Sequence, residues 1–303
     1  MGNAANRSLF TKSRHLFEYV ALLALAFCFN AMPHGLAARI AGSIAYGIGR
    51  FTRGQTAALN NLNHVYPAMS ISDKKRLARN IWYHLGAVFA DFCRMGRISN
   101  RLDHFITLEG KAVIERAKQQ QRPILLVAAH FGNWEVGCLL ANITGIHPNF
   151  IYRSVNNPYI DRWVQQKRRC FAGELLPKGA NTAKQLVRAF LKGKDSGFMF
   201  DLKFNAGKPI SFFGAKCMTA ITPLELGLKH HYQLVLCHCV RHDQGLWRDP
   251  KFTITLEAMN DPESAADHIQ DDALALAIWA HQRLEAWIKQ HPEQWLWLHR
   301  RWG

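Results

Sequence analysis

The stretch ILLVAAHFGNWE, residues 124–135, constrains the fold of this chain more than any other part of the sequence. Its first six residues are all apolar, which is typical of a strand that is covered on both faces of a sheet. Gly132 permits a tight turn, and Asn133 is a suitable N-cap for a helix. The stretch therefore predicts a strand, a turn and a helix in direct succession, with His130 at the carboxyl end of the strand.

The segments around this stretch alternate between strand and helix patterns from residue 105 to residue 258. This rhythm predicts an α/β fold, a mixed central sheet flanked by helices. An amphipathic helix at residues 70–95, opened by Ser70 or Ser72, precedes the alternation, and a long helix at residues 271–290 follows it. The expected strands are residues 105–110, 123–129, 149–153, 173–177, 196–200, 209–214, 232–241 and 252–258.

The most hydrophobic segment lies near the N-terminus, at residues 15–33, and a weaker apolar helix follows at residues 36–50. A membrane span needs ~20 predominantly apolar residues, so the first segment is slightly short. A cleaved signal, a tilted or partial membrane anchor and a buried core helix are the three alternatives. We favour an N-terminal membrane-associated helical segment over residues 1–54, with its N-terminus in the cytoplasm, followed by one α/β domain over residues 55–303.

The chain carries a formal net charge of +16, and this charge is unevenly distributed. Residues 151–194 contain ten Lys or Arg residues and only two acidic residues. A positive surface of this kind favours a polyanionic partner, which could be a phosphorylated substrate, an anionic lipid surface, an acidic protein or nucleic acid. We expect the positive surface to lie near a functional site.

The seven cysteines are odd in number and irregular in spacing. This pattern favours reduced thiols over a disulfide framework. Cys237 and Cys239 alternate inside a predicted strand, and no second pair of ligands matches them. We therefore interpret both as packing residues and expect no metal.

His130 lies where ligands bind in an open α/β sheet, beyond the carboxyl end of a strand. Glu135 falls in the first turn of the next helix, and the turn can fold its carboxylate back toward the imidazole. A carboxylate bonded to one ring nitrogen fixes the tautomer and leaves the other nitrogen as a base. We interpret His130 as a general base oriented by Glu135; the alternative is a structural histidine beside a capping glutamate.

Other catalytic motifs are absent from the sequence. It contains no G-x-S-x-G nucleophile elbow, no H-E-x-x-H zinc motif and neither of the glycine-rich nucleotide-binding loops. Direct attack by a substrate hydroxyl, with His130 as general base, needs the fewest additional groups.

Five motifs, in order along the chain, resemble those of one enzyme family. HFGNWE has the H-x4-[DE] form of the glycerolipid acyltransferase superfamily, and the chain resembles most the lipid A biosynthesis late acyltransferases, the lauroyl and myristoyl transferase group. The resemblance extends over roughly residues 10–303. The motifs are LNNLNHVYPAMSISDKKRLARN, HFGNWE, YRSVNNPYIDRWVQQKRR, FMFDLKFNAGKPISFFGAKCMTAITP and HPEQWLWLHRRW.

This resemblance implies a membrane enzyme of lipopolysaccharide biosynthesis. It would move a fatty acyl chain from an acyl carrier protein thioester to a hydroxyl of a phosphorylated lipid A precursor. The reaction would take place at the cytoplasmic face of the bacterial inner membrane, and it would need no metal or other cofactor.

The resemblance also assigns roles to individual residues. His130 is the general base and Glu135 its orienting partner. Asp201 occupies the family's acidic position, although Leu202 and Lys203 follow where the family often has glutamine next. Phosphate contacts are expected from Arg153, Arg168 and Arg169, further substrate contacts from Asn133 and Asp201, and an apolar wall near the acyl chain from Phe212, Phe213 and Gly214 within SFFG.

The resemblance leaves two features near the C-terminus open. Trp295 and Trp297 are either interfacial anchors or, as we expect, part of a core-packed end. Arg300 and Arg301 could add to the charge that faces the phosphates.

Two alternative functions stay open at this point. The same chemistry could act on another acceptor, such as a glycolipid, a phospholipid or a different membrane-bound intermediate. A non-enzymatic protein that binds anionic lipid or nucleic acid would also fit the charge, but it would not explain His130 with Glu135. Since the sequence lacks the aromatic and basic interleaving of single-strand binders, we expect no nucleic-acid partner.

Overall fold

A seven-stranded sheet forms the centre of the protein in this computed structural model, which describes residues 2–179, 182–261 and 271–302. The strand order is β1-β9-β8-β2-β5-β3-β4, and only the β8–β9 pair is antiparallel. The mixed sheet that the sequence predicted is thereby confirmed. The strands are β1 (Ile106–Glu109), β2 (Ile124–Gly132), β3 (Asn149–Tyr152), β4 (Leu175–Pro177), β5 (Ser196–Met199), β8 (Gln233–His242) and β9 (Lys251–Ala258).

The predicted strand at residues 209–214 lies outside this sheet. It corresponds to β6 (Lys208–Phe212), which pairs only with β7 (Ala215–Thr219) in an antiparallel hairpin. Phe213 and Gly214 make the connection with φ of 48° and 76°. Two consecutive positive φ values fit a two-residue hairpin turn, and so tight a turn makes the strand pair with its immediate neighbour.

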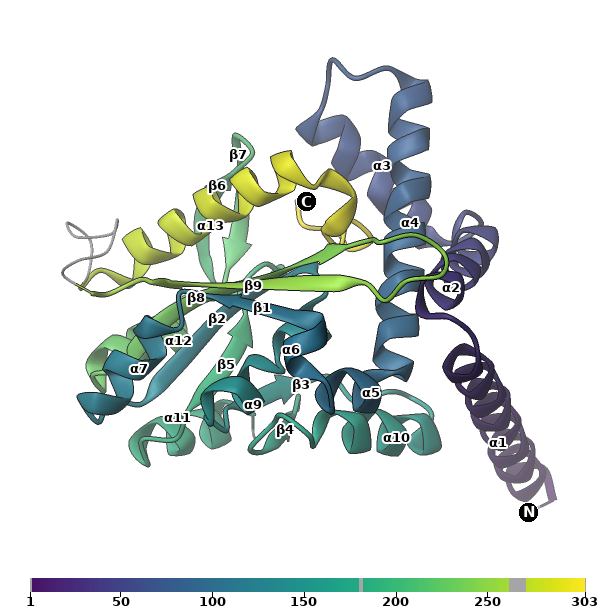
Figure 1. Ribbon diagram of the computed structural model, residues 1–303, viewed down its shortest axis with the longest axis horizontal. Helices are drawn as coiled ribbons and strands as arrows, with labels where there is room; N and C mark the ends of the chain where they lie inside the picture. Colours follow the sequence, from purple (N-terminus) through teal and green to yellow (C-terminus); the bar gives the residue numbers. More distant parts are fainter. Residues whose placement is uncertain (1, 180–181, 262–270, 303) are drawn as a thin grey trace.

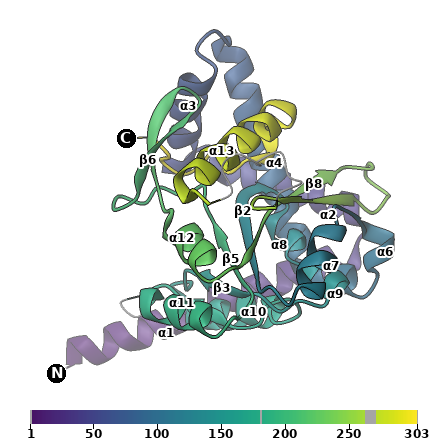
Figure 2. The same ribbon diagram turned by 90° about the vertical axis from the view of Figure 1, so that its left-hand side faces the viewer.

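Helices cover both faces of the sheet (Figures 1 and 2). The helix that was predicted to follow the turn at Gly132 is divided into two short helices, α8 and α9. The helices are α1 (Gly2–Ala31), α2 (His34–Gly49), α3 (Arg53–Val65), α4 (Ile71–Cys93), α5 (Met95–Ser99), α6 (Leu102–Phe105), α7 (Ala112–Gln119), α8 (Trp134–Gly137), α9 (Leu140–Thr144), α10 (Pro158–Arg168), α11 (Thr182–Leu191), α12 (Thr222–Lys229), α13 (Ala273–Gln290) and the short 3-10 helix η1 (Pro292–Gln294).

Two hydrophobic cores lie on opposite faces of the sheet, and β2 contributes to both. Ile124 and Leu126 pack with residues of α7, α8 and α9, whereas Leu125 and Val127 pack with residues of α12 and α13. This alternation follows from the two-residue period of a strand. Because β2 is buried on both faces, it is a rigid support for His130 near its end.

The helix α4 runs past the carboxyl ends of the central strands (Figure 1). Ser70 caps it by accepting a hydrogen bond from the backbone N–H of Asp73, as the sequence predicted. The helix α2 packs closely along it, since a Cβ added to Gly86 would lie 2.4 Å from the backbone oxygen of Ala41. The second N-terminal helix is therefore packed against the α/β body.

The helix α1 extends away from this body (Figure 1) and contacts α2, α4 and α10. Asn157, the N-cap of α10, donates hydrogen bonds to the backbone oxygen of His15 and to Glu18, and Tyr19 stacks on Tyr159. Within the described residues, no helix combines the length and the hydropathy that crossing a bilayer requires.

Candidate active site

His130 and Asp201 meet at the carboxyl ends of two adjacent parallel strands. His130 lies near the end of β2, and Asp201 follows β5 by two residues. The two strands are in register, with Ala128 opposite Met199, so their ends reach the same edge of the sheet. His130 Nδ1 lies 2.9 Å from Asp201 Oδ1.

The Asp201 carboxylate is fully buried and held by three donors. Besides the His130 ring, the backbone N–H of His130 donates to Oδ2 at 2.9 Å and Trp295 Nε1 donates to Oδ2 at 3.0 Å. Burial alone would raise the pKa of Asp201, but His130 and these hydrogen bonds hold it well below its usual value. An ionised carboxylate only accepts hydrogen bonds, so Nδ1 carries the proton and the lone pair lies on Nε2.

The predicted hydrogen bond between Glu135 and His130 was wrong. Glu135 lies in the first turn of α8, as expected, but its two oxygens accept hydrogen bonds from Nε and Nη2 of Arg168 on α10. The ring of His130 has no hydrogen-bond partner other than Asp201 among the described residues. A helix of four residues brings Glu135 within reach of α10, whereas the neighbouring strand brings Asp201 to the ring.

The pKa of His130 reflects both carboxylates. Burial would lower it, but the charge of Asp201, the hydrogen bond to Asp201 and the charge of Glu135 outweigh burial, and the pKa is raised above 6.5. Arg168 opposes the rise. The His130 side chain is 18% exposed, so the ring is enclosed yet accessible. This arrangement produces an oriented imidazole whose Nε2 can accept a proton from a bound hydroxyl.

The turn after His130 depends on Gly132. Its φ is 58°, and an added Cβ would lie 1.6 Å from the backbone oxygen of Cys239 on β8. Asn133 then caps α8 through Val136 N at 3.1 Å, which confirms its predicted position. Its predicted substrate contact was wrong, because Asn133 is fully buried and its amide donates to Asp91 at 2.8 Å.

Asp91 on α4 connects this turn to a buried ionic network. It is fully buried and accepts hydrogen bonds at 2.8 Å from Asn133, from His34 Nε2 and from Arg241 Nε. Burial raises the pKa of Asp91, but Arg241 and His34 outweigh it and lower the pKa to about 2. Because a buried charge needs such partners, the network fixes α2, α4 and β8 around the turn at Gly132.

The predicted arginines lie in different surroundings. Arg168 is committed to Glu135, with 24% of its side chain exposed. Arg153 is exposed directly after β3, and Arg169 is exposed at the end of α10. Arg169 and Arg162 line a cavity of about 410 Å³ on α10. The structure thus brings only Arg168 into contact with a member of the predicted catalytic pair.

The expected apolar wall and the expected substrate contact of Asp201 also differ from the structure. Phe212 is fully buried and stacks on Trp302, so it is a core residue. Phe213 and Gly214 form the turn between β6 and β7. Both carboxylate oxygens of Asp201 bind protein donors, which leaves this side chain the role of positioning His130.

The tryptophan-rich end is packed in the core, as predicted. Trp295 and Trp297 are 1% and 0% exposed. Arg301 is also fully buried, and it donates to Met218 O and Thr219 Oγ1, so its predicted contribution to a phosphate-facing charge was wrong. Arg300 is exposed.

The cysteines of the CHC motif are buried in β8, which confirms their packing role. Burial raises the pKa of Cys237 to about 12, so this thiol stays protonated. No group of three or more His, Cys, Asp or Glu side chains that could hold a metal ion occurs in the described part of the chain.

The fold and the site together define an α/β protein with a carboxylate-bound histidine at the carboxyl end of a buried strand. The chain belongs to the bacterial lipid A biosynthesis acyltransferase family, whose profile matches residues 8–303. The resemblance stated from the motifs is confirmed, and the chain is an acyltransferase of this family.

Individual relatives are distant. The lipid A biosynthesis palmitoleoyltransferase of Escherichia coli strain K12 is 24% identical over 257 residues, which covers 82% of this chain and 78% of the relative. A lipid A biosynthesis acyltransferase of Haemophilus influenzae is 21% identical over 285 residues, which covers 91% of this chain and 83% of the relative.

Proposed function

We propose that this enzyme transfers a fatty acyl chain from an acyl carrier protein thioester directly to a hydroxyl of a phosphorylated lipid A precursor. The observation that carries the proposal is the 2.9 Å hydrogen bond between His130 Nδ1 and the buried Asp201 carboxylate. It fixes the tautomer in which Nε2 is free to act as a base. Family membership supplies the class of reaction.

In the proposed reaction, Nε2 of His130 removes the proton of the acceptor hydroxyl. The oxygen attacks the thioester carbonyl, and the carbon–sulfur bond breaks as the ester forms. The departing thiolate takes the proton from the imidazolium, so His130 returns to its neutral form without a covalent acyl-enzyme. Asp201 stabilises the transient imidazolium because its carboxylate is already ionised and bonded to Nδ1.

We assign Glu135 and Arg168 a supporting role beside this base. Glu135 raises the pKa of His130 through its charge, and Arg168 partly neutralises Glu135. The pair therefore adjusts the basicity of His130 from the side of α10. The exposed Arg153 and Arg169 add positive charge on the same helix and the preceding strand end, which suits an acidic carrier protein or an acceptor phosphate.

We also propose that residues 1–54 attach the enzyme to the cytoplasmic face of the inner membrane, with residues 55–303 as the catalytic part. All the exposed residues of α1 between positions 16 and 28 are apolar or cysteine, an arrangement that favours lying in the membrane interface. These residues are Leu16, Phe17, Val20, Ala21, Leu23, Ala24, Phe27 and Cys28.

Two further segments extend this apolar surface. Ile40, Ile44 and Ile48 are exposed along one stripe of α2. Trp247, 75% exposed, lies in the loop between β8 and β9, next to α2, where Gly35 N donates to Arg248 O at 3.2 Å. We call these residues together with the exposed residues of α1 the apolar docking surface. In the sequence Arg39 precedes Ile40 and Arg248 follows Trp247, and apolar side chains beside arginines are suited to an anionic lipid interface.

Mass spectrometry of membrane lipids, from cells with and without the gene, tests the proposed function. We expect lipid A to lose one acyl chain in the deletion strain and to regain it with the wild-type gene but not with His130→Ala. A change confined to another lipid would identify a different acceptor for the same chemistry. No change in any acyl lipid would contradict the proposal.

A further inference from the structure

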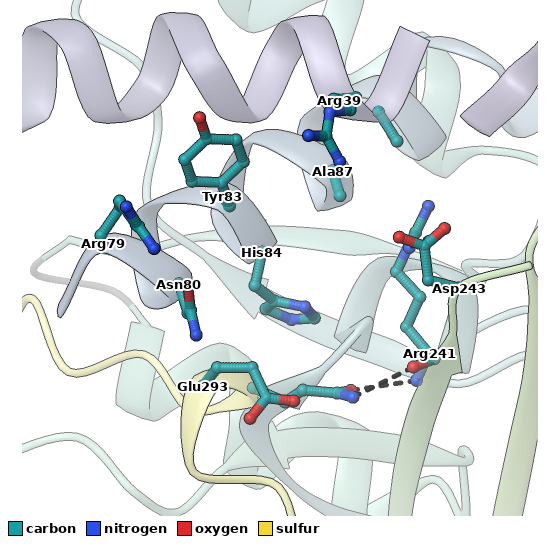
Figure 3. Close-up of a pocket in the computed structure, with 11 residues that line it drawn as sticks. Arg39, Arg79, Asn80, Tyr83, His84, Ala87, Arg241, Asp243 and Glu293 are labelled. Carbon is teal, nitrogen blue, oxygen red and sulfur yellow. Dashed lines mark hydrogen bonds and ion pairs between the residues drawn. The ribbon is translucent and has the colours of Figure 1, made fainter. Parts of the chain in front are cut away.

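A second cavity lies between α2, α4, the end of β8 and η1 (Figure 3). Relative to the turn at Gly132, it is on the side of β8, whereas Asp201 is on the side of β5. Its volume is about 570 Å³, and apart from two alanines its lining is polar or charged. His84 Nε2 donates to Gly132 O at 3.0 Å, so one wall of the cavity is bonded to the turn that follows His130. A lining of this composition suits a polar ligand rather than an acyl chain.

Two arginines line this cavity from neighbouring helices. Arg39 belongs to α2 and Arg79 to α4, and within the described residues neither guanidinium group forms a hydrogen bond or an ion pair. Arg241, by contrast, is held by Asp91 at 2.8 Å and by Asp243 at 3.7 Å. The guanidinium groups of Arg39 and Arg79 are therefore available to a ligand, and guanidinium forks match phosphate oxygens.

Groups that suit hydroxyls complement these cations. Asp243 and Glu293 bring carboxylates to the same cavity, and Glu293 has no hydrogen bond or ion pair in the described part of the chain. His84 uses its Nε2–H on Gly132 O, which leaves Nδ1 as an acceptor, and burial lowers the pKa of His84 to about 4. Carboxylates and a neutral imidazole accept hydrogen bonds from hydroxyl groups, and the carboxylates also repel a simple anion.

We propose that this cavity binds the phosphorylated saccharide head group of the lipid acceptor, with its phosphate on Arg39 and Arg79 and its hydroxyls on Glu293 and His84. The proposal rests on the proposed function, because it places the head group of that acceptor. Arg39 is followed by Ile40, an exposed residue of the apolar docking surface. A head group in the cavity would thus lie at the depth of the membrane interface, with its acyl chains against that surface.

Binding is measured first, on a chain that cannot catalyse. In the His130→Ala background, ligand-detected NMR titrations compare glucose 1-phosphate, inorganic phosphate and glucose as soluble probes. The test variant is Arg39→Ala with Arg79→Ala. The control is Arg53→Ala with Lys75→Ala, which removes the same charge from two exposed residues that do not line the cavity.

We expect the sugar phosphate to bind more tightly than either other probe, and the test variant to weaken it about tenfold or more. The control variant should bind the sugar phosphate with an affinity within about twofold of the parent's. Equal binding by the test variant and the control, or no saturable binding to the parent, would overturn the proposal. Inorganic phosphate binding as tightly as the sugar phosphate would overturn the saccharide part.

Kinetics on the active chain give the second measurement. Arg39→Ala with Arg79→Ala should raise the KM for the acceptor about tenfold or more, with the KM for the acyl donor unchanged. A rise in the donor KM alone would overturn the assignment to the acceptor. If the wild-type chain transfers no acyl group, the proposed function fails, whereas the binding titration still decides whether the cavity holds a sugar phosphate.

Discussion

Asp201 Oδ1 accepts a hydrogen bond from His130 Nδ1 at 2.9 Å, between residues that are far apart in sequence and come from the ends of two adjacent parallel strands. The same carboxylate accepts from Trp295, a residue of the C-terminal segment. The sheet and the C-terminal segment thus together hold the carboxylate that orients the imidazole. Asp201 and Trp295 are both buried. The contact between His130 and Asp201, rather than one within the HFGNWE motif, fixes the tautomer of His130.

Asp201→Asn should reduce the rate of acyl transfer by roughly a hundredfold or more, because the amide can stabilise the wrong tautomer and cannot stabilise an imidazolium. The substitution should also move the acidic limb of the profile of acyl-transfer rate against pH. The raised pKa of His130 places the wild-type limb above pH 6.5, since the base form appears only above that pKa. Without the carboxylate, burial dominates and the limb moves to lower pH.

Glu135→Gln is the matched control for that profile. The charge of Glu135 contributes less than that of Asp201 to the raised pKa of His130. The acidic limb should therefore move in the same direction as in Asp201→Asn, but by a smaller amount. A larger shift in Glu135→Gln than in Asp201→Asn would contradict the assignment of Asp201 as the orienting group.

Glu135 and Arg168 should behave as one unit in a double-mutant cycle. Removal of either leaves the other charge largely buried, because Glu135 and Arg168 have side-chain exposures of 11% and 24%. We expect a coupling free energy of about 1–3 kcal/mol in urea unfolding. The exposed pair Asp73 and Arg76 is the control and should couple by less than about 1 kcal/mol. Additive effects of Glu135→Ala and Arg168→Ala on the free energy of unfolding would contradict the predicted coupling of the two residues.

Gly132→Ala should destabilise the chain by more than about 2 kcal/mol and abolish activity, because the residue has a positive φ and its Cβ would collide with Cys239 O. Gly47→Ala is a suitable comparison, since it lies in α2 with nothing within 4 Å of an added Cβ. That variant should be neutral or gain about 0.5–1 kcal/mol from helix propensity. Thermal unfolding of both proteins measures the contrast, and equal stabilities would contradict the account of the turn.

The apolar docking surface should determine binding to anionic vesicles. Phe27→Ser combined with Trp247→Ser removes two side chains that are 74% and 75% exposed, and we expect the partition coefficient to fall at least about tenfold. Leu191→Ser removes a comparably exposed side chain from α11 and should leave vesicle binding unchanged. Co-sedimentation that is equally weakened by both changes would assign the effect to general hydrophobicity instead.

The βα alternation, the buried strand that carries His130 and the turn at Gly132 could all be predicted from sequence, because they are local patterns. The partner of His130 could not be assigned correctly from local spacing. Glu135 is near in sequence, whereas Asp201 is near in space only because β2 and β5 are adjacent, and strand order is not a local property. The apolar strand pattern that ends just before Asp201 was the available signal.

The wrong predictions of substrate contacts have a similar cause, because the burial of a residue also depends on distant parts of the chain. Asn133, Phe212 and Arg301 have residue types that suit substrate contacts, and each is fully buried by elements distant in sequence. The cavity between α2 and β8 combines four separate segments of the chain. Arg79 and Glu293 lie in two of the quoted motifs, but neither motif indicates that they line one cavity. Only the packing of α2 along α4 brings Arg39 and Arg79 to one cavity.

The rate of acyl transfer by purified wild-type and His130→Ala chains tests the central claim most directly. Acyl-loaded carrier protein and a phosphorylated lipid A precursor are the substrates, mass spectrometry follows the acylated product, and circular dichroism verifies that the variant is folded. We predict product with the wild type and a loss of about a thousandfold or more in the variant. A folded His130→Ala chain that keeps the wild-type rate would contradict the account.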